Sequence, residues 1–143
     1  MPLGPDRFTK SKQLGALSTT TEYSLWTNDT GNVVELDAAQ FNQLTAITCS
    51  TNGFWTFDIY AYDSDGVQGD VIATLHYGTA SAAGYVGDHV AFVAEDLTLD
   101  STGLAIDDGS GCTIKATLYG TGAMLSADAE ITARFAKGMT SAA

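Results

Sequence analysis

The stretch GFWTFDIYAY, residues 53–62, has the clearest two-residue alternation in this 143-residue chain. In an extended chain every second side chain lies on the same face. One face carries Trp55 and Phe57, which we expect in a core because large aromatic side chains are enriched in half-buried strands. The other face carries Tyr60 and Tyr62, which are candidate interface residues because tyrosine is enriched where proteins contact one another. The stretch therefore predicts a strand with one core face and one solvent face.

Further short runs of strand-forming residues lie on both sides of this stretch, with turn residues between them. They predict strands over residues 23–27, 33–36, 44–50, 71–77, 89–94, 97–106 (in two pieces), 112–119 and 129–135. Residues 28–31, 63–66 and 107–111 predict turns, because they combine asparagine or aspartate with glycine. Residues 37–44 predict a short helical turn with Asp37 as its N-cap. About eight or nine strands at this spacing predict an all-β fold, either an antiparallel β-sandwich or a jelly-roll-like barrel.

The charge of the chain is unevenly distributed. Six lysine and arginine residues stand against 17 aspartate and glutamate residues, which gives a formal net charge of −11 at pH 7. Half of the positive charge, from Arg7, Lys10 and Lys12, lies near the N-terminus. Residues 1–20 show no hydrophobic period, so we expect an extended arm there. The predicted organisation is an arm over residues 1–20, a β-sandwich domain over residues 21–137 and a frayed C-terminal tail over residues 138–143.

We expect the N-terminal arm to bind a large partner. A short basic segment on an acidic protein is attracted to an acidic surface of a neighbour, and apolar side chains within the segment anchor it after contact. The residues predicted to make these contacts are Leu3, Arg7, Phe8, Lys10, Lys12 and Leu14. On this prediction, a protein without residues 1–14 folds but no longer binds its assembly. The alternative interpretation is a frayed terminus with incidental charges.

The acidity of the remaining chain argues against several kinds of partner. A strongly negative surface repels the phosphates of nucleic acid and the surface of an anionic membrane, so we expect neither partner. No apolar run approaches the length of about 20 residues that a membrane-spanning helix needs. The first residues lack the apolar centre of a secretory signal, which predicts synthesis in a cytoplasm.

No motif in the chain indicates catalysis, and the sequence predicts that the protein is not an enzyme. A serine–histidine–aspartate site needs a histidine beside a nucleophile on an exposed turn, but His76 and His89 both lie in predicted strands. Two histidines on neighbouring strands can also share a metal ion, although ordinary half-buried strand residues are the commoner explanation. Cys49 and Cys112 are interpreted as buried thiols, with a disulfide or a reactive thiol as the alternative.

Closely spaced carboxylates in one predicted turn form a candidate calcium site. Calcium binds several oxygen ligands in a sharply turning loop. Asp63, Asp65 and Asp70 lie together with two glycines and are therefore candidate ligands. A solvated β-turn uses the same residue types, and the bidentate glutamate that ends the twelve-residue calcium loop is missing. No other cofactor is predicted.

The start MPLGPDRFTKSK, the body rich in alanine, threonine, glycine and aspartate, and the acidic balance together resemble the decoration, or cement, proteins of tailed-bacteriophage capsids. The resemblance covers the full length of the chain and concerns its composition and layout. It implies a β-rich structural protein that is made in the host cytoplasm and located in the virion. Such a protein binds the major capsid protein on the outside of the shell and stabilises the shell, commonly as a trimer or dimer.

Two other functions fit the same chain. One is a carbohydrate-binding β-sandwich module, in which exposed aromatic side chains form a platform for sugar rings. Its candidate residues are Trp26, Trp55, Tyr60, Tyr62 and Tyr77. The other is a different small virion component, such as a connector or a tail protein.

Overall fold

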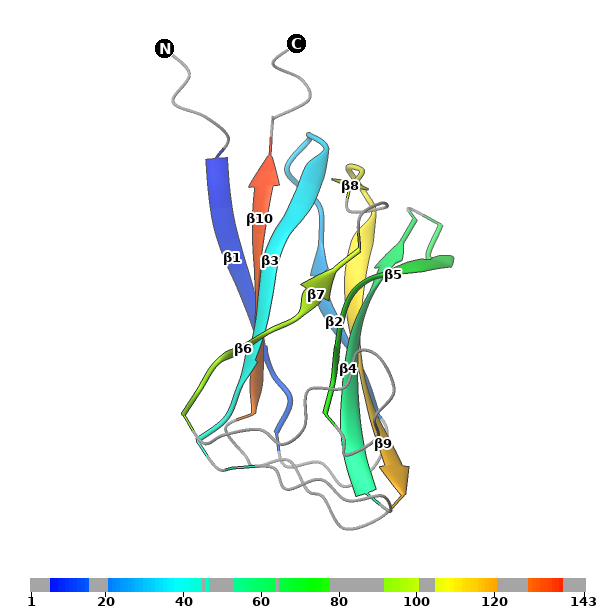
Figure 1. Ribbon diagram of the computed structural model, residues 1–143. Helices are drawn as coiled ribbons and strands as arrows, with labels where there is room; N and C mark the ends of the chain where they lie inside the picture. Colours follow the sequence, from blue (N-terminus) through cyan, green and yellow to red (C-terminus); the bar gives the residue numbers. More distant parts are fainter. Residues whose placement is uncertain are drawn as a thin grey trace.

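Two antiparallel β-sheets pack face to face in the computed structural model (Figure 1). The structure describes residues 6–15, 21–44, 46, 53–63, 65–77, 92–100, 105–120 and 129–137. Sheet A contains, in spatial order, β1 (Asp6–Gln13), β10 (Glu130–Lys137), β3 (Val34–Asn42) and β6 (Glu95–Asp96), with β8 (Ala105–Ile106) also paired to β3. Sheet B contains β2 (Thr21–Thr27), β9 (Gly111–Gly120), β4 (Gly53–Tyr62), β5 (Gln68–His76) and β7 (Thr98–Leu99). The predicted antiparallel β-sandwich is confirmed. Within the ranges given above, no helix is long and apolar enough to cross a membrane.

The core between the sheets is built from the inward faces of the long strands. Trp55, Phe57 and Ile59 of β4 are fully buried, which confirms the prediction for the first two. Phe41 of sheet A stacks on Phe57 with 4.4 Å between the ring centroids. Tyr77 meets the ring of Phe57 edge-on at 6.2 Å. Ring pairs of these kinds add to the free energy gained by burying apolar area, so this aromatic cluster holds the two sheets together.

Residues 37–42 belong to strand β3, so the predicted helical turn is wrong. Ala39 and Phe41 are buried on the core face of β3, which pairs with β10 along most of its length. The pairing skips Asp37, which is the extra residue of a β-bulge. The bulge hides the alternation in the sequence, and a local preference for helix is too weak to override this long-range pairing.

Two other predicted strands lie partly outside the described residues. For the predicted strand over residues 89–94, the structure describes only residues 92–94, which form a turn and loop before β6. For the predicted strand over residues 44–50, it describes only Leu44 and Ala46, and neither belongs to a strand. The short strands β7 and β8 agree with the prediction of two pieces over residues 97–106.

The N-terminal segment contributes a strand to the sandwich, which corrects the prediction of a separate arm over residues 1–20. β1 pairs with β10 from Asp6 opposite Lys137 to Gln13 opposite Glu130. Leu14, directly after β1, is 3% exposed and belongs to the core. The alternation of β1 is hard to recognise in the sequence because lysines occupy two of its inward positions, a known arrangement for an edge strand.

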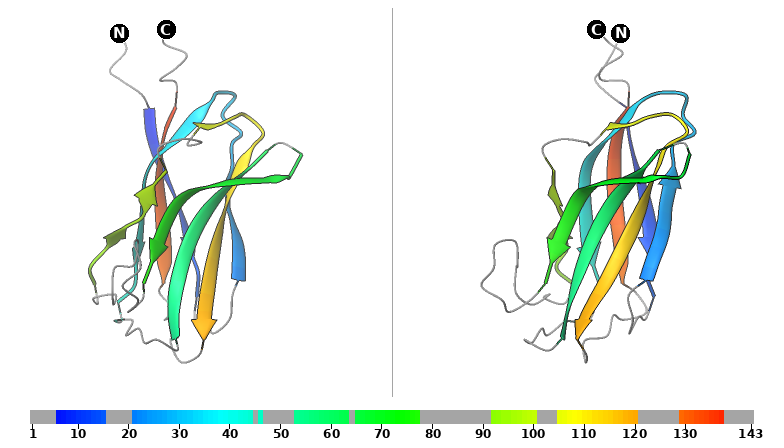
Figure 2. Two further views of the ribbon diagram at one scale, coloured as in Figure 1. Left: turned by 45° about the vertical axis from the view of Figure 1, so that its right-hand side comes forward. Right: turned by 90° about the vertical axis from the view of Figure 1, so that its right-hand side faces the viewer.

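One side of the sandwich is closed by a chain segment that passes from one sheet to the other (Figure 2). β6 pairs with β3 in sheet A, and β7 pairs with β5 in sheet B. Leu97 between them is buried, and its amide donates a hydrogen bond of 2.8 Å to the carbonyl of Ala39. On the opposite side, β1 and β2 form the ends of the two sheets.

Asn28 joins two turns at one end of the sandwich, and it is only 1% exposed. Its Nδ2 donates hydrogen bonds to the carbonyls of Asn32 and Ile106, at 2.7 and 2.9 Å. Its Oδ1 accepts hydrogen bonds from the amide and the hydroxyl of Thr30, at 3.0 and 2.7 Å. A buried polar side chain is stabilising only when its donors and acceptors are paired, and all those of the Asn28 amide group are paired here.

The two turns joined by Asn28 lie within residues 28–31 and 107–111, where the sequence predicts turns. The backbone amide of Asn28 donates to the carbonyl of Ser110 at 2.7 Å, and the amide of Gly109 donates to the carbonyl of Asn28 at 2.8 Å. Gly31 and Gly109 have φ values of 81° and 88°, a backbone region that glycine adopts without strain. Both turn predictions are confirmed.

Candidate functional site

The edge formed by β1 and β2 carries most of the residues predicted to bind a partner. A groove with a volume of about 380 Å³ lies along this edge. Its lining residues are Arg7, Phe8, Thr9, Lys10, Trp26, Asp29 and Thr30. The structure therefore brings together Arg7, Phe8 and Lys10 of the predicted set. Leu14 is in the core of the protein itself, and Leu3 lies outside the described residues.

Phe8 and Trp26 form an aromatic floor between the two edge strands. Their ring centroids are 5.3 Å apart, and the ring of Phe8 also stacks on Phe135 at 5.5 Å. The ammonium group of Lys10 lies 5.9 Å from the ring centroid of Phe8 and 6.0 Å from that of Trp26. Ammonium groups at such distances from ring centroids are attracted to the negative face of the ring. Lys10 therefore packs its aliphatic stem along the edge of the core and keeps its charge at the surface.

Lys12, two residues after Lys10 on β1, makes a similar contact with an aromatic ring. Its ammonium group lies 5.8 Å from the ring centroid of Tyr23 on β2. The hydroxyl of Tyr23 donates a 2.7 Å hydrogen bond to the carbonyl of Leu14, which ties the end of β1 to sheet B. Burial raises the pKa of Tyr23, and a hydrogen bond with Thr21 opposes this rise. Two lysines thus line the space between the edge strands from the same face of β1.

Arg7 lies on the outer face of sheet A and is paired within the protein. Its Nε lies 3.1 Å from Oδ2 of Asp37, and Nε of Arg134 lies 2.7 Å from the same oxygen. The β-bulge in β3 places this carboxylate between the two guanidinium groups. Partial burial raises the pKa of Asp37, but the hydrogen bonds and charges of Arg7 and Arg134 outweigh burial and lower the pKa below its usual value. Arg7 therefore joins β1 to the middle of its own sheet.

Replacing Asp37 by asparagine is expected to lower stability at neutral pH and to have no effect in strong acid. A carboxyl with a lowered folded-state pKa stabilises the protein above its unfolded-state pKa, and this contribution is lost as the pH falls through the folded-state value. All three side chains are partly exposed, so we expect a loss of about 1 kcal/mol or less at pH 7. Urea unfolding at about pH 7 and about pH 2.5 measures the difference.

The control for the Asp37 variant is Glu35→Gln in the same strand, where the cross-strand neighbours of Glu35 are Ala105 and Ala136. We expect this control to be closer to the wild-type protein at both pH values. An Asp37→Asn difference that is as large in acid as at neutral pH would show that the charge does not cause it.

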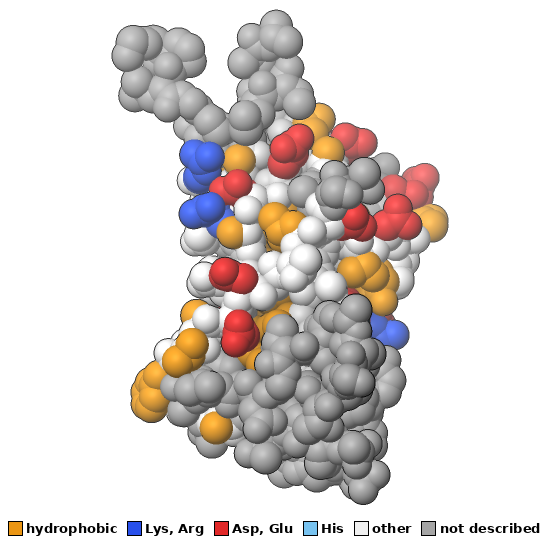
Figure 3. Space-filling view, in the orientation of Figure 1, with side chains coloured by type: hydrophobic (Ala, Val, Ile, Leu, Met, Phe, Trp, Pro, Cys, Tyr) orange, Lys and Arg blue, Asp and Glu red, His pale blue; other side chains and the backbone are white. Residues whose placement is uncertain are grey.

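Figure 3 shows the charges on one face of the molecule. Basic side chains lie on the side of β1 with acidic side chains beside and below them, one further basic side chain lies on the opposite side, and several acidic side chains lie toward the end of the β4–β5 hairpin. Within the described chain, that hairpin carries the exposed residues Asp63, Asp65 and Asp70. The basic edge strand therefore contrasts with an acidic surface elsewhere on the same sandwich.

The predicted interface residues Tyr60 and Tyr62 are half-buried and lie on the outer face of sheet B. The hydroxyl of Tyr62 donates a 3.1 Å hydrogen bond to Oε1 of Gln68 in β5, which holds the ring along the sheet. Both residues are placed on the solvent face, as the alternation predicts. Whether they bind a partner stays a prediction.

A polar cluster that the sequence analysis missed lies on the same outer face. The hydroxyl of Thr74 donates to Oδ1 of Asp58 at 2.6 Å, and it lies 2.7 Å from Nε2 of His76. That nitrogen is also 3.4 Å from Oδ1 of Asp58. In a serine–histidine–aspartate site the carboxylate and the nucleophile contact different ring nitrogens. Here both contacts use Nε2, so the cluster lacks that geometry. His89 lies outside the described residues. The possible metal-binding pair of His76 and His89 therefore also lies outside them.

The candidate calcium ligands do not form one site. Oδ1 of Asp63 accepts hydrogen bonds from the amides of Asp65 and Val67, both at 2.9 Å. Gly66, with φ of 80°, donates from its amide to the carbonyl of Asp63 at 3.0 Å. This arrangement is a turn stabilised by an aspartate side chain, and Asp70 lies apart from it on β5. Among the residues that the structure describes, no group of three or more histidine, cysteine or acidic residues is placed to hold a metal ion.

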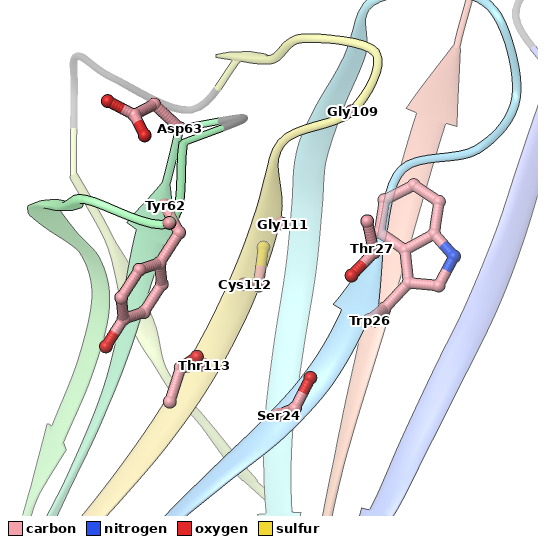
Figure 4. A pocket seen from close by; sticks show the side chains of 10 residues that line it. Ser24, Trp26, Thr27, Tyr62, Asp63, Gly109, Gly111, Cys112 and Thr113 are labelled. Carbon is pink, nitrogen blue, oxygen red and sulfur yellow. The ribbon is translucent and has the colours of Figure 1, made fainter.

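A shallow cleft of about 270 Å³ lies on the outer face of sheet B beside this turn (Figure 4). Tyr62, Thr113 and Ser24 come to it from three neighbouring strands, and Figure 4 shows them along the sheet. Gly111 forms part of its floor, where a Cβ would lie only 2.8 Å from the carbonyl oxygen of Trp26. The sequence analysis missed the cleft because its side chains meet only through the strand register. Of the five aromatic residues predicted to form a carbohydrate platform, Trp55 and Tyr77 are fully buried in the core, so the structure contradicts the prediction for these two. The carbohydrate-binding alternative itself stays a prediction.

Cys112 is a buried thiol, as the sequence predicts. It is 2% exposed in the core, and burial raises the pKa of its thiol to about 12. Because the thiolate is the reactive form of cysteine, this thiol is unsuited to act as a nucleophile. Cys49 lies outside the described residues, so the alternative of a disulfide between Cys49 and Cys112 lies outside them too.

Three exposed apolar side chains come together at the other end of β3. Phe92 is 70% exposed, Leu44 52% and Val93 49%. The amide of Phe92 donates a 3.2 Å hydrogen bond to the carbonyl of Gln43, which brings the two segments together. Phe92 also has a φ of 67°, an uncommon backbone region for a bulky residue. Exposed apolar groups that gather are typical of contact surfaces.

No protein-family model matches the chain, and no curated protein matches it. Three solved structures match over 94% of this chain. One is a CocE/NonD family hydrolase from Staphylococcus aureus, with 10% identity and a TM-score of 0.42 over 36% of that chain. The others are structures of infectious bursal disease virus, Gt and Gx strains, with 12% identity, TM-scores of 0.36 and 0.33, and 34% and 30% of those chains covered. The chain thus spans about a third of each matched chain.

The prediction that the protein is not an enzyme is contradicted, because one of these structures is a hydrolase. At 10% identity and a TM-score below 0.5, the match assigns no reaction and no catalytic residue to this chain. At 12% identity and TM-scores below 0.5, the two virus structures likewise assign no role to this chain. These three matches do not test the prediction that the protein is a phage decoration protein.

Proposed function

We propose that the protein is a structural component of a virion that binds the outer surface of a capsid shell and stabilises the shell, as decoration proteins do. The observation that carries this proposal is strand β1, a basic edge strand on an acidic sandwich. β1 pairs with β10 on one side only in the described part of the chain, and it carries Arg7, Lys10 and Lys12. Complementary charge speeds the encounter with an acidic shell and selects the orientation of binding.

The major capsid protein is the proposed partner. Repeated copies around a shell act together, so a modest contact at each copy gives firm attachment of the whole layer. A trimer or dimer of the protein at a symmetry axis increases this effect. The apolar cluster around Phe92 provides a further contact surface away from the basic edge. We also propose that the protein is made in the host cytoplasm and is then added to the shell.

Charge reversal at Lys10 and Lys12 tests the proposal. Purified protein is mixed with shells assembled from the major capsid protein of the same genome, and co-sedimentation gives the occupancy. We expect the Lys10→Glu/Lys12→Glu variant to bind at least about tenfold more weakly than the wild-type protein, which corresponds to about 1.4 kcal/mol. Deletion of residues 1–14 is a poorer test, because it removes a strand of sheet A and the core residue Leu14.

The matched control is Lys115→Gln, which removes a lysine charge in β9 without placing an acid opposite Glu22 and Asp58. We expect shells to bind this control like the wild-type protein. Thermal unfolding of each variant shows whether it is folded. Wild-type protein that does not sediment with the shells, or a folded double variant with unchanged occupancy, would contradict the proposal.

A further inference from the structure

Among the described residues, β1 pairs with β10 only, so its other edge offers backbone amides and carbonyls to a further strand. On its paired edge, β1 is aligned with β10 over its whole length, from Asp6 to Gln13, so its backbone is held straight and extended. An extended edge strand presents a row of amides and carbonyls to an incoming segment. Beside this row, the groove with Phe8 and Trp26 leaves space for those side chains of the segment that lie on the same face as Lys10 and Lys12.

The charges along the edge select which segment fits. Lys10 and Lys12 are two residues apart and lie over rings on the same face of β1. In a strand, side chains two residues apart are about 6.5–7 Å from each other. An incoming strand with carboxylates at alternate positions therefore matches both ammonium groups at once. Arg7 adds a third positive charge on the outer face, with its side chain 50% exposed.

The same charges disfavour pairing of β1 with β1 of a second copy. In an antiparallel pair of identical strands centred on Ser11, Lys10 of each copy lies opposite Lys12 of the other. Like charges directly opposite one another across strands are destabilising. Inward-pointing lysines are a known means by which edge strands avoid association with their own kind. Like charge therefore disfavours this β1–β1 register, whereas an acidic strand meets the two lysines with opposite charge.

We propose that β1 binds an extended acidic segment of a partner protein by strand addition, with carboxylates at alternate positions of that segment paired with Lys10 and Lys12. This inference rests on the proposed function and specifies the contact through which the protein holds its shell. In that setting the bound segment belongs to the major capsid protein.

A short synthetic peptide in which glutamate alternates with valine is the probe. It is titrated into the full-length, isotope-labelled protein, and NMR records chemical shifts and the hydrogen exchange of each backbone amide. We expect shifts to concentrate on β1 and on Trp26, and amides on the free edge of β1 to exchange more slowly in the complex. A peptide of the same composition with its glutamates grouped together is the comparison, and we expect it to bind about tenfold more weakly.

Variants of the two lysines identify the contact. We expect Lys10→Gln/Lys12→Gln to weaken binding of the alternating peptide by about tenfold, and Lys10→Arg/Lys12→Arg to retain it. Lys115→Gln is the matched control and leaves binding unchanged. Equal binding of both peptides, shifts centred away from β1, or no slowing of exchange in β1 would each overturn strand addition.

The two proposals fail in different ways. In one outcome, shells bind the wild-type protein but not the Lys10→Glu/Lys12→Glu variant, and the alternating peptide does not bind β1. Attachment by the basic edge is then supported, and strand addition is wrong. If the peptide binds as described while shells do not, the acidic-strand site stands and its partner is another protein.

Discussion

Replacing Phe57 by alanine is expected to lower the free energy of unfolding by about 3–5 kcal/mol. The ring of Phe57 is fully buried, and it contacts Phe41 of the opposite sheet as well as Trp55 and Tyr77. The substitution removes apolar area from the core and leaves a cavity between two rigid sheets that close only partly around it. Urea unfolding followed by tryptophan fluorescence measures the change.

Tyr60→Ala is the control for this variant, because Tyr60 belongs to the same strand and lies on its solvent face. We expect it to cost about 1 kcal/mol or less. Phe57→Leu, which keeps most of the apolar volume, is expected to fall between the two. A loss of less than about 1 kcal/mol for Phe57→Ala would mean that the sheets do not meet at this aromatic cluster.

Replacing Asn28 by alanine is expected to cost about 3 kcal/mol, the second large effect in this protein. The change removes four side-chain hydrogen bonds, to the carbonyls of Asn32 and Ile106 and from the amide and hydroxyl of Thr30. A buried partner that loses its hydrogen bond retains the cost of having left water. Thermal or urea unfolding measures the loss, and hydrogen exchange at the amide of Thr30 locates it.

Asn32→Ala is the matched control, because it removes the same type of side chain from the same turn. The side chain of Asn32 makes an exposed hydrogen bond of 3.4 Å to the carbonyl of Thr30, which is too long to contribute much. We expect a change within about 0.5 kcal/mol. Equal losses for the two variants would show that burial of Asn28 is not the cause.

The sequence predicts the sandwich wherever a strand alternates without interruption. Residues 53–62 and 112–119 have that pattern, and both lie in long central strands of sheet B. Turns are predictable where aspartate or asparagine precedes glycine, as at residues 107–111. In these places local preference and long-range pairing favour the same structure, so either is sufficient to identify it.

The misses share one physical cause, which is that the deciding interaction lies far away in the chain. β1 was not recognised because Lys10 and Lys12 occupy inward positions, and only the rings of β2 explain why they are tolerated there. Only the start of β3 is predictable, as the strand over residues 33–36, because Asp37 interrupts the alternation after it, and only Arg7 and Arg134 explain the bulge. The same limit applies to the candidate site. Its edge and groove depend on the register between strands, and this register cannot be derived from the amino-acid composition.

The pairing of β1 with β10 has a consequence for how the chain folds. It joins the first strand to the last, and the hydroxyls of Ser11 and Thr132 are 3.0 Å apart although 121 residues separate them. Contacts between such distant residues form late, because the intervening chain must first be ordered. While a ribosome is still making the protein, β1 has no partner, and the hairpin of β4 and β5 is able to form before it. The basic edge therefore exists in its native form only after residues 130–137 have left the ribosome.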